Sequence, residues 1–214
     1  MKLIIGNKNY SSWSLRAWLA AREGGFTFEE IRIPLFIPGS RERILSHSPS
    51  GKVPCLIDHG FTVWDSLAIG EYLAEKAPAL LPADPAARAI ARAATAEMHA
   101  GFQNLRSRMP MNIRKDYAGF GHSPEVDADI ARIVALWTDC RGRFGGGGPY
   151  LFGHFTLADA AFAPVAFRFQ TYGVKPEGVA GEYAATLLAN AHMQEWAAAA
   201  RAETEAIPEE DLYG

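Results

Sequence analysis

The character of the sequence changes near residue 77, and no other feature restricts the possible folds as strongly. Up to that point, short strand-like runs alternate with helical segments in the order β-α-β, then α-β-β-α. A proline-marked linker follows, and alanine-rich helical patterns then continue to the end of the chain. We therefore predict an α/β domain over 1–77, a linker over 78–85 and an all-α domain over 86–214.

The expected elements follow from periodicity and from turn residues. A strand-like run from Lys2 leads into a helix that ends at the break Gly24-Gly25, and the next strand covers 26–33. A short helical piece, a proline-marked turn, two strands that meet at His59-Gly60 and a helix from Ser66 complete the first domain. In the second domain, helices are predicted over 86–109, 125–144, 157–170, 182–190 and 193–206.

Charge and cysteine content narrow the possible functions. The 21 basic and 24 acidic residues give a formal net charge of −3, which provides no global case for binding nucleic acid or a membrane surface. Cys55 and Cys140 are too few for a disulfide framework or a zinc-ligand spacing, and they indicate a reducing compartment. The sequence has neither a signal-peptide pattern nor an apolar run of membrane-spanning length. We expect a cytoplasmic protein without a metal.

A loop with three serines, SSWSLR at 11–16, joins the first strand to the first helix. The first turn of a helix has unpaired N–H groups and a partial positive charge, so it stabilises an anion placed there. A serine hydroxyl at this point can also donate to that anion. Taken alone, the segment favours an ordinary helix cap, because serine is among the preferred residues at that position.

Several separated motifs together resemble the cytosolic glutathione transferase superfamily. SSWSLR resembles the Ser-Ser-Cys-Ser-x-Arg signature of the zeta class, which includes maleylacetoacetate isomerases, and KVPCL and DSLAIGEYL resemble the glutathione-binding segments. The resemblance covers nearly the whole chain. It implies a thioredoxin-like first domain, an all-helical second domain, glutathione as cosubstrate, a small electrophile as the other substrate and a homodimer.

The resemblance assigns glutathione contacts to individual residues. Val53-Pro54 follows the family pattern in which a cis peptide bond exposes the backbone of the preceding residue to the cysteinyl unit. Ser66, at a helix start, would hold the γ-glutamyl carboxylate, and Asp65 would face the amino group. Lys52 would compensate the glycyl carboxylate. Helix capping by Asp65 and Ser66, and a solvated Lys52, are the structural alternatives.

Catalysis by such a protein requires the glutathione thiolate, because it is a much better nucleophile than the thiol. A thiol has an unperturbed pKa of about 8.5, which a serine O–H and a helix start both lower. Ser12 is the first candidate, since it precedes Arg16 by four residues, the spacing found in theta-like members. Ser11, the first serine of the zeta-like pair, is the alternative. Trp13 replaces the cysteine of the zeta signature, which argues against a cysteine-dependent mechanism.

The second domain is expected to supply the electrophile pocket, because pockets commonly form between domains. Asn104, in FQNL, resembles a Gln-Asn-Leu element of the zeta class, and the resemblance implies a further glutathione contact; a solvated position on the helix surface is the alternative that the residue type favours. Thr156 and Asp159 form a capping-box-like motif, for which we predict a structural role. Arg106 and Arg108 are further candidates to attract an anionic substrate. The predicted pocket residues are Trp13, Met109, Met111, Arg114, Tyr117, Arg168 and Tyr172.

The sequence therefore predicts a glutathione transferase in which Ser12, assisted by Ser11, stabilises the thiolate for attack on a small electrophile. One alternative is a zeta-like isomerase, in which the thiolate adds reversibly to an unsaturated diacid, the former double bond rotates, and glutathione is eliminated. Another is a noncatalytic binding protein that retains the fold. The serines and the glutathione-site motifs argue against this last alternative.

Overall fold

The computed structural model describes residues 1–213, and its first domain is built on a four-stranded sheet in the order β2-β1-β3-β4. β1 (Lys2–Ile5) pairs in parallel with β2 (Glu29–Arg32) and antiparallel with β3 (Cys55–Asp58). A tight turn joins β3 to its antiparallel neighbour β4 (Phe61–Trp64). This sheet confirms the predicted thioredoxin-like order of elements, although β2 is shorter than the expected strand.

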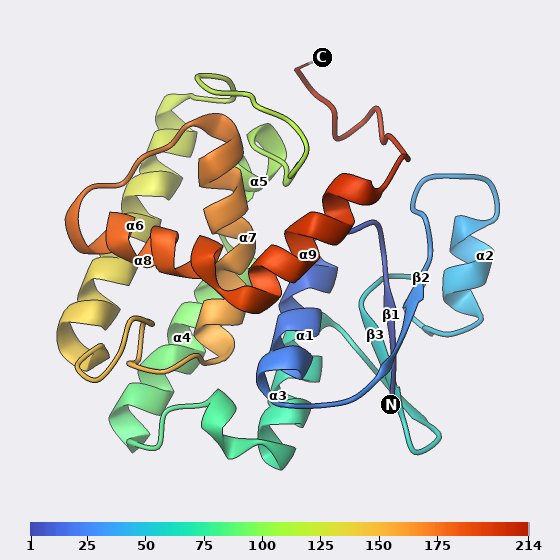
Figure 1. The fold of residues 1–214 in the computed structure, drawn as a ribbon, viewed down its shortest axis with the longest axis horizontal. Helices are drawn as coiled ribbons and strands as arrows, with labels where there is room; N and C mark the ends of the chain where they lie inside the picture. Colours follow the sequence, from blue (N-terminus) through green and yellow to red (C-terminus); the bar gives the residue numbers. More distant parts are fainter. Residues whose placement is uncertain (214) are drawn as a thin grey trace.

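Helices cover both faces of the sheet, as Figure 1 shows. They are α1 (Ser12–Glu23), α2 (Ser40–Leu45) and α3 (Ser66–Lys76). Because side chains alternate along a strand, Leu3 and Ile5 of β1 pack with residues of α1 and α3. Ile4 points the other way and packs with Ile44 of α2. The sheet therefore separates a large core from a small one.

The second domain is helical throughout, which confirms the predicted class. After a short 3₁₀ helix, η1 (Pro78–Leu80), come α4 (Pro85–Ala100), α5 (Gln103–Arg108), α6 (Pro124–Phe144), α7 (Leu157–Tyr172), α8 (Gly178–Ala189) and α9 (Ala191–Ala202). α7 packs against α1, α4 and α8, and all of its residues except Gln170 are buried or nearly so. A helix that is apolar on nearly every face is expected at such a central position. Over residues 1–213, no helix has the length and apolarity needed to cross a membrane.

The helix predicted over 86–109 is interrupted, and this boundary was wrong. Phe102 adopts a left-handed conformation with φ of 57°, and α5 begins directly after it. The backbone N–H of Leu105 in α5 donates to Asp129 Oδ2 of α6 at 2.9 Å. A contact from a distant helix therefore supports a new helix start where the local pattern alone predicts continuation.

The end of the chain also differs from the prediction. The last helix stops at Ala202 rather than at 206, and residues 203–213 form a tail that returns to the first domain. The Glu203 carboxylate accepts hydrogen bonds from the backbone N–H groups of Lys8 (2.7 Å) and Asn9 (3.1 Å). α8 begins earlier than predicted, at Gly178. The helix α9 therefore ends at Ala202 because the Glu203 carboxylate that follows it is bound by backbone N–H groups of the first domain.

The two domains share one hydrophobic core. Trp18 of α1 clusters with Phe167 of α7 and Trp196 of α9. The two tryptophan rings meet edge to face with their centroids 5.3 Å apart, and Trp196 Nε1 donates to the carbonyl oxygen of Lys8 at 2.9 Å. Because these rings are buried and Trp196 is hydrogen-bonded to Lys8, the contact holds α1 against α9 and Phe167 of α7, which positions the site described next.

Candidate active site

The serine loop forms the start of α1. Ser11 is the N-cap residue: its Oγ accepts from the backbone N–H of Ser14 at 3.3 Å and donates to Ser14 Oγ at 2.8 Å. Ser14 Oγ in turn accepts from the backbone N–H of Gly6 at 3.1 Å. The hydroxyl of Ser11 therefore both donates and accepts a hydrogen bond within the cap. Through Ser14, the cap also connects the start of α1 to the residue that follows β1.

Ser12, the first residue of α1, has a different environment. It is buried, with 6% of its surface exposed, and it lies in the wall of a cavity between the domains. Its Oγ accepts a long hydrogen bond of 3.3 Å from Nη2 of Arg168, a residue of α7. Arg168 Nε donates to the carbonyl oxygen of Met109 at 2.8 Å, which holds the guanidinium in place. Unlike Ser11, Ser12 is thus turned toward the second domain.

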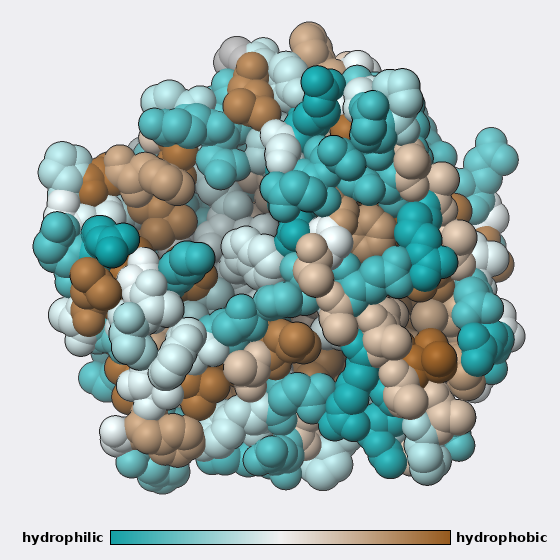
Figure 2. All heavy atoms as spheres, turned by 180° about the vertical axis from the view of Figure 1, so that it is seen from behind, coloured by the Kyte–Doolittle hydropathy of each residue, from teal (hydrophilic) through white to brown (hydrophobic). Residues whose placement is uncertain are grey.

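Two cavities meet beside these serines. The smaller one, with a volume of about 490 Å³, lies between the loop before β3, the end of β4, and α4. The larger one, of about 730 Å³, contains Ser11 and Ser12 and lies between α2, α5, α7 and the tail. Trp13, Lys52 and Val53 line both cavities. Figure 2 shows this face of the molecule hollowed beside the α2 region.

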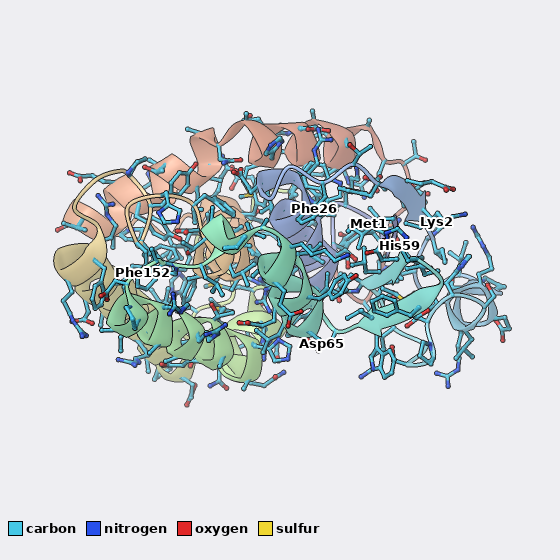
Figure 3. All side chains as sticks on the ribbon, turned by 90° about the horizontal axis from the view of Figure 1, so that it is seen from below. Met1, Lys2, Phe26, His59, Asp65 and Phe152 are labelled. Carbon is cyan, nitrogen blue, oxygen red and sulfur yellow. The ribbon has the colours of Figure 1, made fainter. Side chains whose placement is uncertain are left out.

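The smaller cavity contains the first-domain residues that the sequence assigns to glutathione: Lys52, Val53, Pro54, Asp65 and Ser66. The Val53-Pro54 peptide bond is cis, as the family pattern predicts. Figure 3 shows Asp65 at the junction of the two domains, where α3 begins. The structure therefore brings these separated motifs together at one place.

Asp65 combines two roles at this junction. Its Oδ1 accepts from the backbone N–H of Leu67 at 2.8 Å, which caps α3, and its Oδ2 lies 3.4 Å from Nε2 of His99 in α4. Ser66, 7% exposed, is the first residue of α3 and lines the cavity. Asn104 is exposed on α5 and lines neither cavity, so the structure does not bring it to this group.

The larger cavity has walls of different character. On the α2 side an apolar patch includes Phe36 and Ile37, which are 69% and 44% exposed, and Arg41 of α2 lies beside this patch in the cavity lining. On the opposite side it contains Arg106, Arg168 and, from the tail, Glu210. Burial raises the pKa of Glu210, which the positive charge of Arg168 opposes. The cavity thus presents an apolar patch flanked by Arg41 opposite a mainly cationic wall.

Of the predicted pocket residues, three line the larger cavity: Trp13, Met111 and Arg168. Met109, Tyr117 and Tyr172 belong to the hydrophobic core of the helical domain instead. Arg114 holds the tail: it donates to the carbonyl oxygens of Glu203 and Glu205 and to the hydroxyl of Tyr10. The chain turns at Met109 and Tyr172 so that these side chains pack inward, which residue type alone does not reveal.

The sequence reasoning missed the apolar wall and Glu210. Phe36 and Ile37 precede α2 in a segment without a recognised motif, and Glu210 lies beyond the last predicted helix. The one available signal was the pair of large apolar residues in a proline-flanked loop, since such residues exposed together mark binding surfaces.

Arginines surround Trp13 where the two cavities meet. The guanidinium carbon of Arg16 lies 4.3 Å from the Trp13 ring centroid and that of Arg106 lies 5.0 Å away, both close enough for cation–π attraction. Arg16 is 5% exposed, and its side-chain nitrogens have no hydrogen-bond partner among residues 1–213. Burial, with the charges of Arg168 and Arg106, lowers the pKa of Arg16 to about 9. Within the described residues, no three His, Cys, Asp or Glu side chains are grouped to hold a metal.

Comparison with known proteins identifies the fold and the family. Residues 10–76 match the family described as glutathione S-transferase, N-terminal domain, and residues 123–202 match glutathione S-transferase, C-terminal domain. The chain is 30% identical over 182 residues to the maleylacetoacetate isomerase of Pseudomonas aeruginosa, an alignment that covers 81% of this chain and 84% of that protein. It is 29% identical over 167 residues to a probable maleylacetoacetate isomerase of Caenorhabditis elegans, with 76% of each chain covered.

Solved structures share the same fold. The holo structure of a maleyl pyruvate isomerase, described as a bacterial glutathione S-transferase in the zeta class, has a TM-score of 0.72 at 24% identity and covers 96% of this chain and 100% of that one. A glutathione transferase homologue from Burkholderia with bound glutathione has a TM-score of 0.69, also at 24% identity, over 94% and 98%. With both halves matched in order, the chain belongs to the glutathione S-transferase family, as a zeta-like member and a glutathione-dependent enzyme.

Proposed function

We propose that glutathione binds in the smaller cavity with its sulfur directed to the point where the two cavities meet. Lys52 would balance the glycyl carboxylate, the backbone of Val53 would pair with the cysteinyl unit, and the start of α3 at Ser66 would hold the γ-glutamyl carboxylate. The partial positive charge at the start of α3 would thus balance the γ-glutamyl carboxylate, and Asp65 would balance the amino group. The donor set in this cavity fits the peptide.

Ser12, rather than Ser11, would donate to the sulfur, and one observation carries this assignment. Ser11 Oγ already donates to Ser14 Oγ within the helix cap. Ser12 Oγ accepts from Arg168, so its hydroxyl hydrogen is available to a sulfur in the adjoining cavity. The α1 start adds its partial positive charge. Together they would lower the thiol pKa and keep the nucleophile as thiolate.

The reaction best supported is conjugation. The thiolate would attack an electrophilic carbon held in the larger cavity, forming a carbon–sulfur bond as a leaving group departs from that carbon with the electron pair of the broken bond. The thiol proton would already have passed to solvent. The apolar wall at Phe36 and Ile37 suits the hydrocarbon part of such an electrophile.

The alternative function is zeta-like isomerisation of an unsaturated diacid, and the cationic wall favours it. Arg106 and Arg168 present guanidinium groups, which recognise carboxylates well. The relatives named as maleylacetoacetate isomerases agree with this alternative. Incubation with glutathione and cis unsaturated diacids separates the two functions. Isomerised product with glutathione unchanged supports isomerisation, whereas a stable thioether supports conjugation.

The test of the assignment is a pH titration of the ultraviolet absorbance of bound glutathione thiolate. We expect Ser12→Ala to keep glutathione binding and to raise the bound thiol pKa by about one to two units, the worth of a hydrogen bond to a charged group. Ser11→Ala is the matched control: it should lower stability through the lost cap while moving the thiol pKa far less. The opposite ranking of the two variants would assign the sulfur contact to Ser11. A wild-type protein that binds no glutathione would instead favour a noncatalytic role.

The protein is proposed to act in the cytoplasm as a homodimer. The outer strand β4 supports a contact surface, because Phe61 and Trp64 on it are 48% and 47% exposed. Light scattering in solution tests the assembly: a mass near 23.3 kDa would contradict it, and twice that mass would support it. Mutation of Phe61 to Lys is the variant expected to shift the mass toward the monomer, since Phe61, unlike Trp64, does not line the smaller cavity.

A further inference from the structure

The hydroxyl group of Ser12 is met by a charged side chain from the other domain. Arg168 is 156 positions away in the sequence, yet its Nη2 lies 3.3 Å from Ser12 Oγ. A guanidinium has only hydrogen-bond donors, so in this contact the serine oxygen must be the acceptor. The lone pair of Ser12 that faces α7 is therefore occupied, and the O–H bond must point in another direction.

The position of Arg168 is costly for the fold. It is 3% exposed on α7, a helix otherwise made of core residues, and no carboxylate of the described chain forms an ion pair with it. One of its three nitrogens, Nη1, has no hydrogen-bond partner. Burial and the charge of Arg106 lower its pKa to about 10. Glu210 attracts this cation without an ion-pair contact, and a buried cation so weakly compensated is unfavourable for stability, which suggests that it serves the site.

Its placement is nevertheless well defined. The bond from Nε to the carbonyl oxygen of Met109 anchors the guanidinium at 2.8 Å, so Nη2 is presented to Ser12 from a fixed direction. The charged or titratable groups around it are Arg16 of α1, Arg106 of α5, Tyr172 of α7 and Glu210 of the tail. Arg41 and Lys52 also line the same cavity. Among the charged side chains of the described residues, Arg168 is the one that donates a hydrogen bond to Ser12.

We propose that Arg168 is a positioning residue for Ser12: it occupies the serine oxygen and thereby directs the serine hydrogen toward the sulfur of glutathione. The proposal rests on the proposed function, since it assumes that glutathione sulfur lies beside Ser12. In this role Arg168 lowers the thiol pKa by orienting the Ser12 hydroxyl, which is a different effect from attracting an anionic electrophile. A donor that is already oriented loses less entropy when it bonds the thiolate, and its polarised O–H donates more strongly.

A double-mutant cycle on the pKa of the bound glutathione thiol tests this route. The variants are Arg168→Met, Ser12→Ala and the combination of both, titrated by thiolate absorbance as above. We expect Arg168→Met to raise the thiol pKa by about 0.7 unit, the worth of about one neutral hydrogen bond. In the Ser12→Ala background the same substitution should produce a smaller shift, because the hydroxyl is gone and only the direct effect of the lost charge on the thiolate remains.

Arg106→Met is the matched control, because it removes the same charge from the same cavity without a contact to Ser12. Its effect on the thiol pKa should be equal with and without the Ser12 hydroxyl. If Arg168→Met also gives equal shifts in the two backgrounds, Arg168 acts only as a charge and the proposal is overturned. An unchanged thiol pKa in Arg168→Met, with a raised one in Ser12→Ala, overturns it as well.

Failure of the proposed function gives a different result from failure of this proposal. If Ser12→Ala itself leaves the bound thiol pKa unchanged, Ser12 is not the sulfur donor, and both assignments fall. Should Arg168→Met not fold, Arg168→Lys replaces it in the same cycle. Lysine keeps the charge, so a shift in the thiol pKa that occurs only when the Ser12 hydroxyl is present reports the loss of the guanidinium geometry. If Arg168→Lys shifts the thiol pKa equally with and without the Ser12 hydroxyl, the positioning role is again rejected.

Discussion

Asp159 is a buried carboxylate whose environment explains its place in the sequence motif. Its Oδ2 accepts from the backbone N–H and the hydroxyl of Thr156 at 2.7 and 2.9 Å. Its Oδ1 accepts from the backbone N–H of Leu151 at 3.1 Å and from the hydroxyl of Tyr183 at 2.9 Å. Burial raises the pKa of Asp159, and these hydrogen bonds oppose that shift. Asp159 thus joins α7 to α8 through Tyr183, and to the loop that precedes α7 through Leu151.

Replacement of Asp159 by alanine is expected to destabilise the protein by about 3 kcal/mol or more, because several buried donors lose their acceptor at once. Chemical denaturation measures this directly. Asp139→Ala is the control, since that carboxylate is on the surface and, among residues 1–213, pairs with Arg143 at 2.9 Å; its cost should stay within about 0.5 kcal/mol. Similar costs for both variants would contradict the structural role of Asp159.

At the scale of elements, Asp58 fastens α3 to the sheet. It ends β3, is 2% exposed, and accepts hydrogen bonds from Tyr72 and Lys76 of α3, each at 2.7 Å. The hydrogen bond from Lys76, followed by that from Tyr72, lowers the pKa of Asp58. A carboxyl whose pKa is lower in the folded than in the unfolded chain stabilises the fold above the unfolded pKa, near 3.9.

This contribution is lost as the pH falls through the lowered pKa of Asp58, so acid should weaken the attachment of α3. We expect Asp58→Asn to be less stable than wild type near pH 7, with the difference shrinking as the pH falls below about 4. Urea unfolding midpoints across this pH range are the measurement. Asp139→Asn should follow the wild-type curve closely, and a pH-independent deficit in Asp58→Asn would rule out the linkage.

For the molecule as a whole, the tail closes one side of the larger cavity. Asp211 accepts from the hydroxyl of Tyr10 at 3.1 Å and from Nδ2 of Asn112 at 2.6 Å, which anchors the tail to both domains. Its neighbour Glu210 reaches the cavity wall. One wall of this cavity is therefore formed by a segment that lies at the opposite end of the chain from the serine loop.

Asp211→Ala is expected to loosen residues 203–213 and to speed backbone hydrogen exchange there about tenfold, because two anchoring hydrogen bonds are lost. Exchange in α7 should remain unchanged. Glu209→Ala is the matched control, since Glu209 is exposed on the same tail. Equal exchange in the two variants would mean that Asp211 does not hold the tail.

Local rules in the sequence were enough for the order of elements, for the turn at His59-Gly60 and for the capping motif at Asp159. These features depend on neighbours within a few residues, and such neighbours are visible in the sequence. For Lys52, Val53, Asp65 and Ser66, local rules predict only a proline-marked turn and a capped helix start, and their assignment to one glutathione site came from the family resemblance; the fold then brings the two segments to one cavity.

The tertiary structure decided that Arg168 of α7 contacts Ser12 and not Ser11, whose hydroxyl bonds within the helix cap. It also decided the break at Phe102 and the course of the tail. These outcomes depend on contacts between segments more than 20 positions apart, such as Leu105 with Asp129 and Lys8 with Glu203. Such contacts form only when packing has brought the segments together, and no local pattern specifies them.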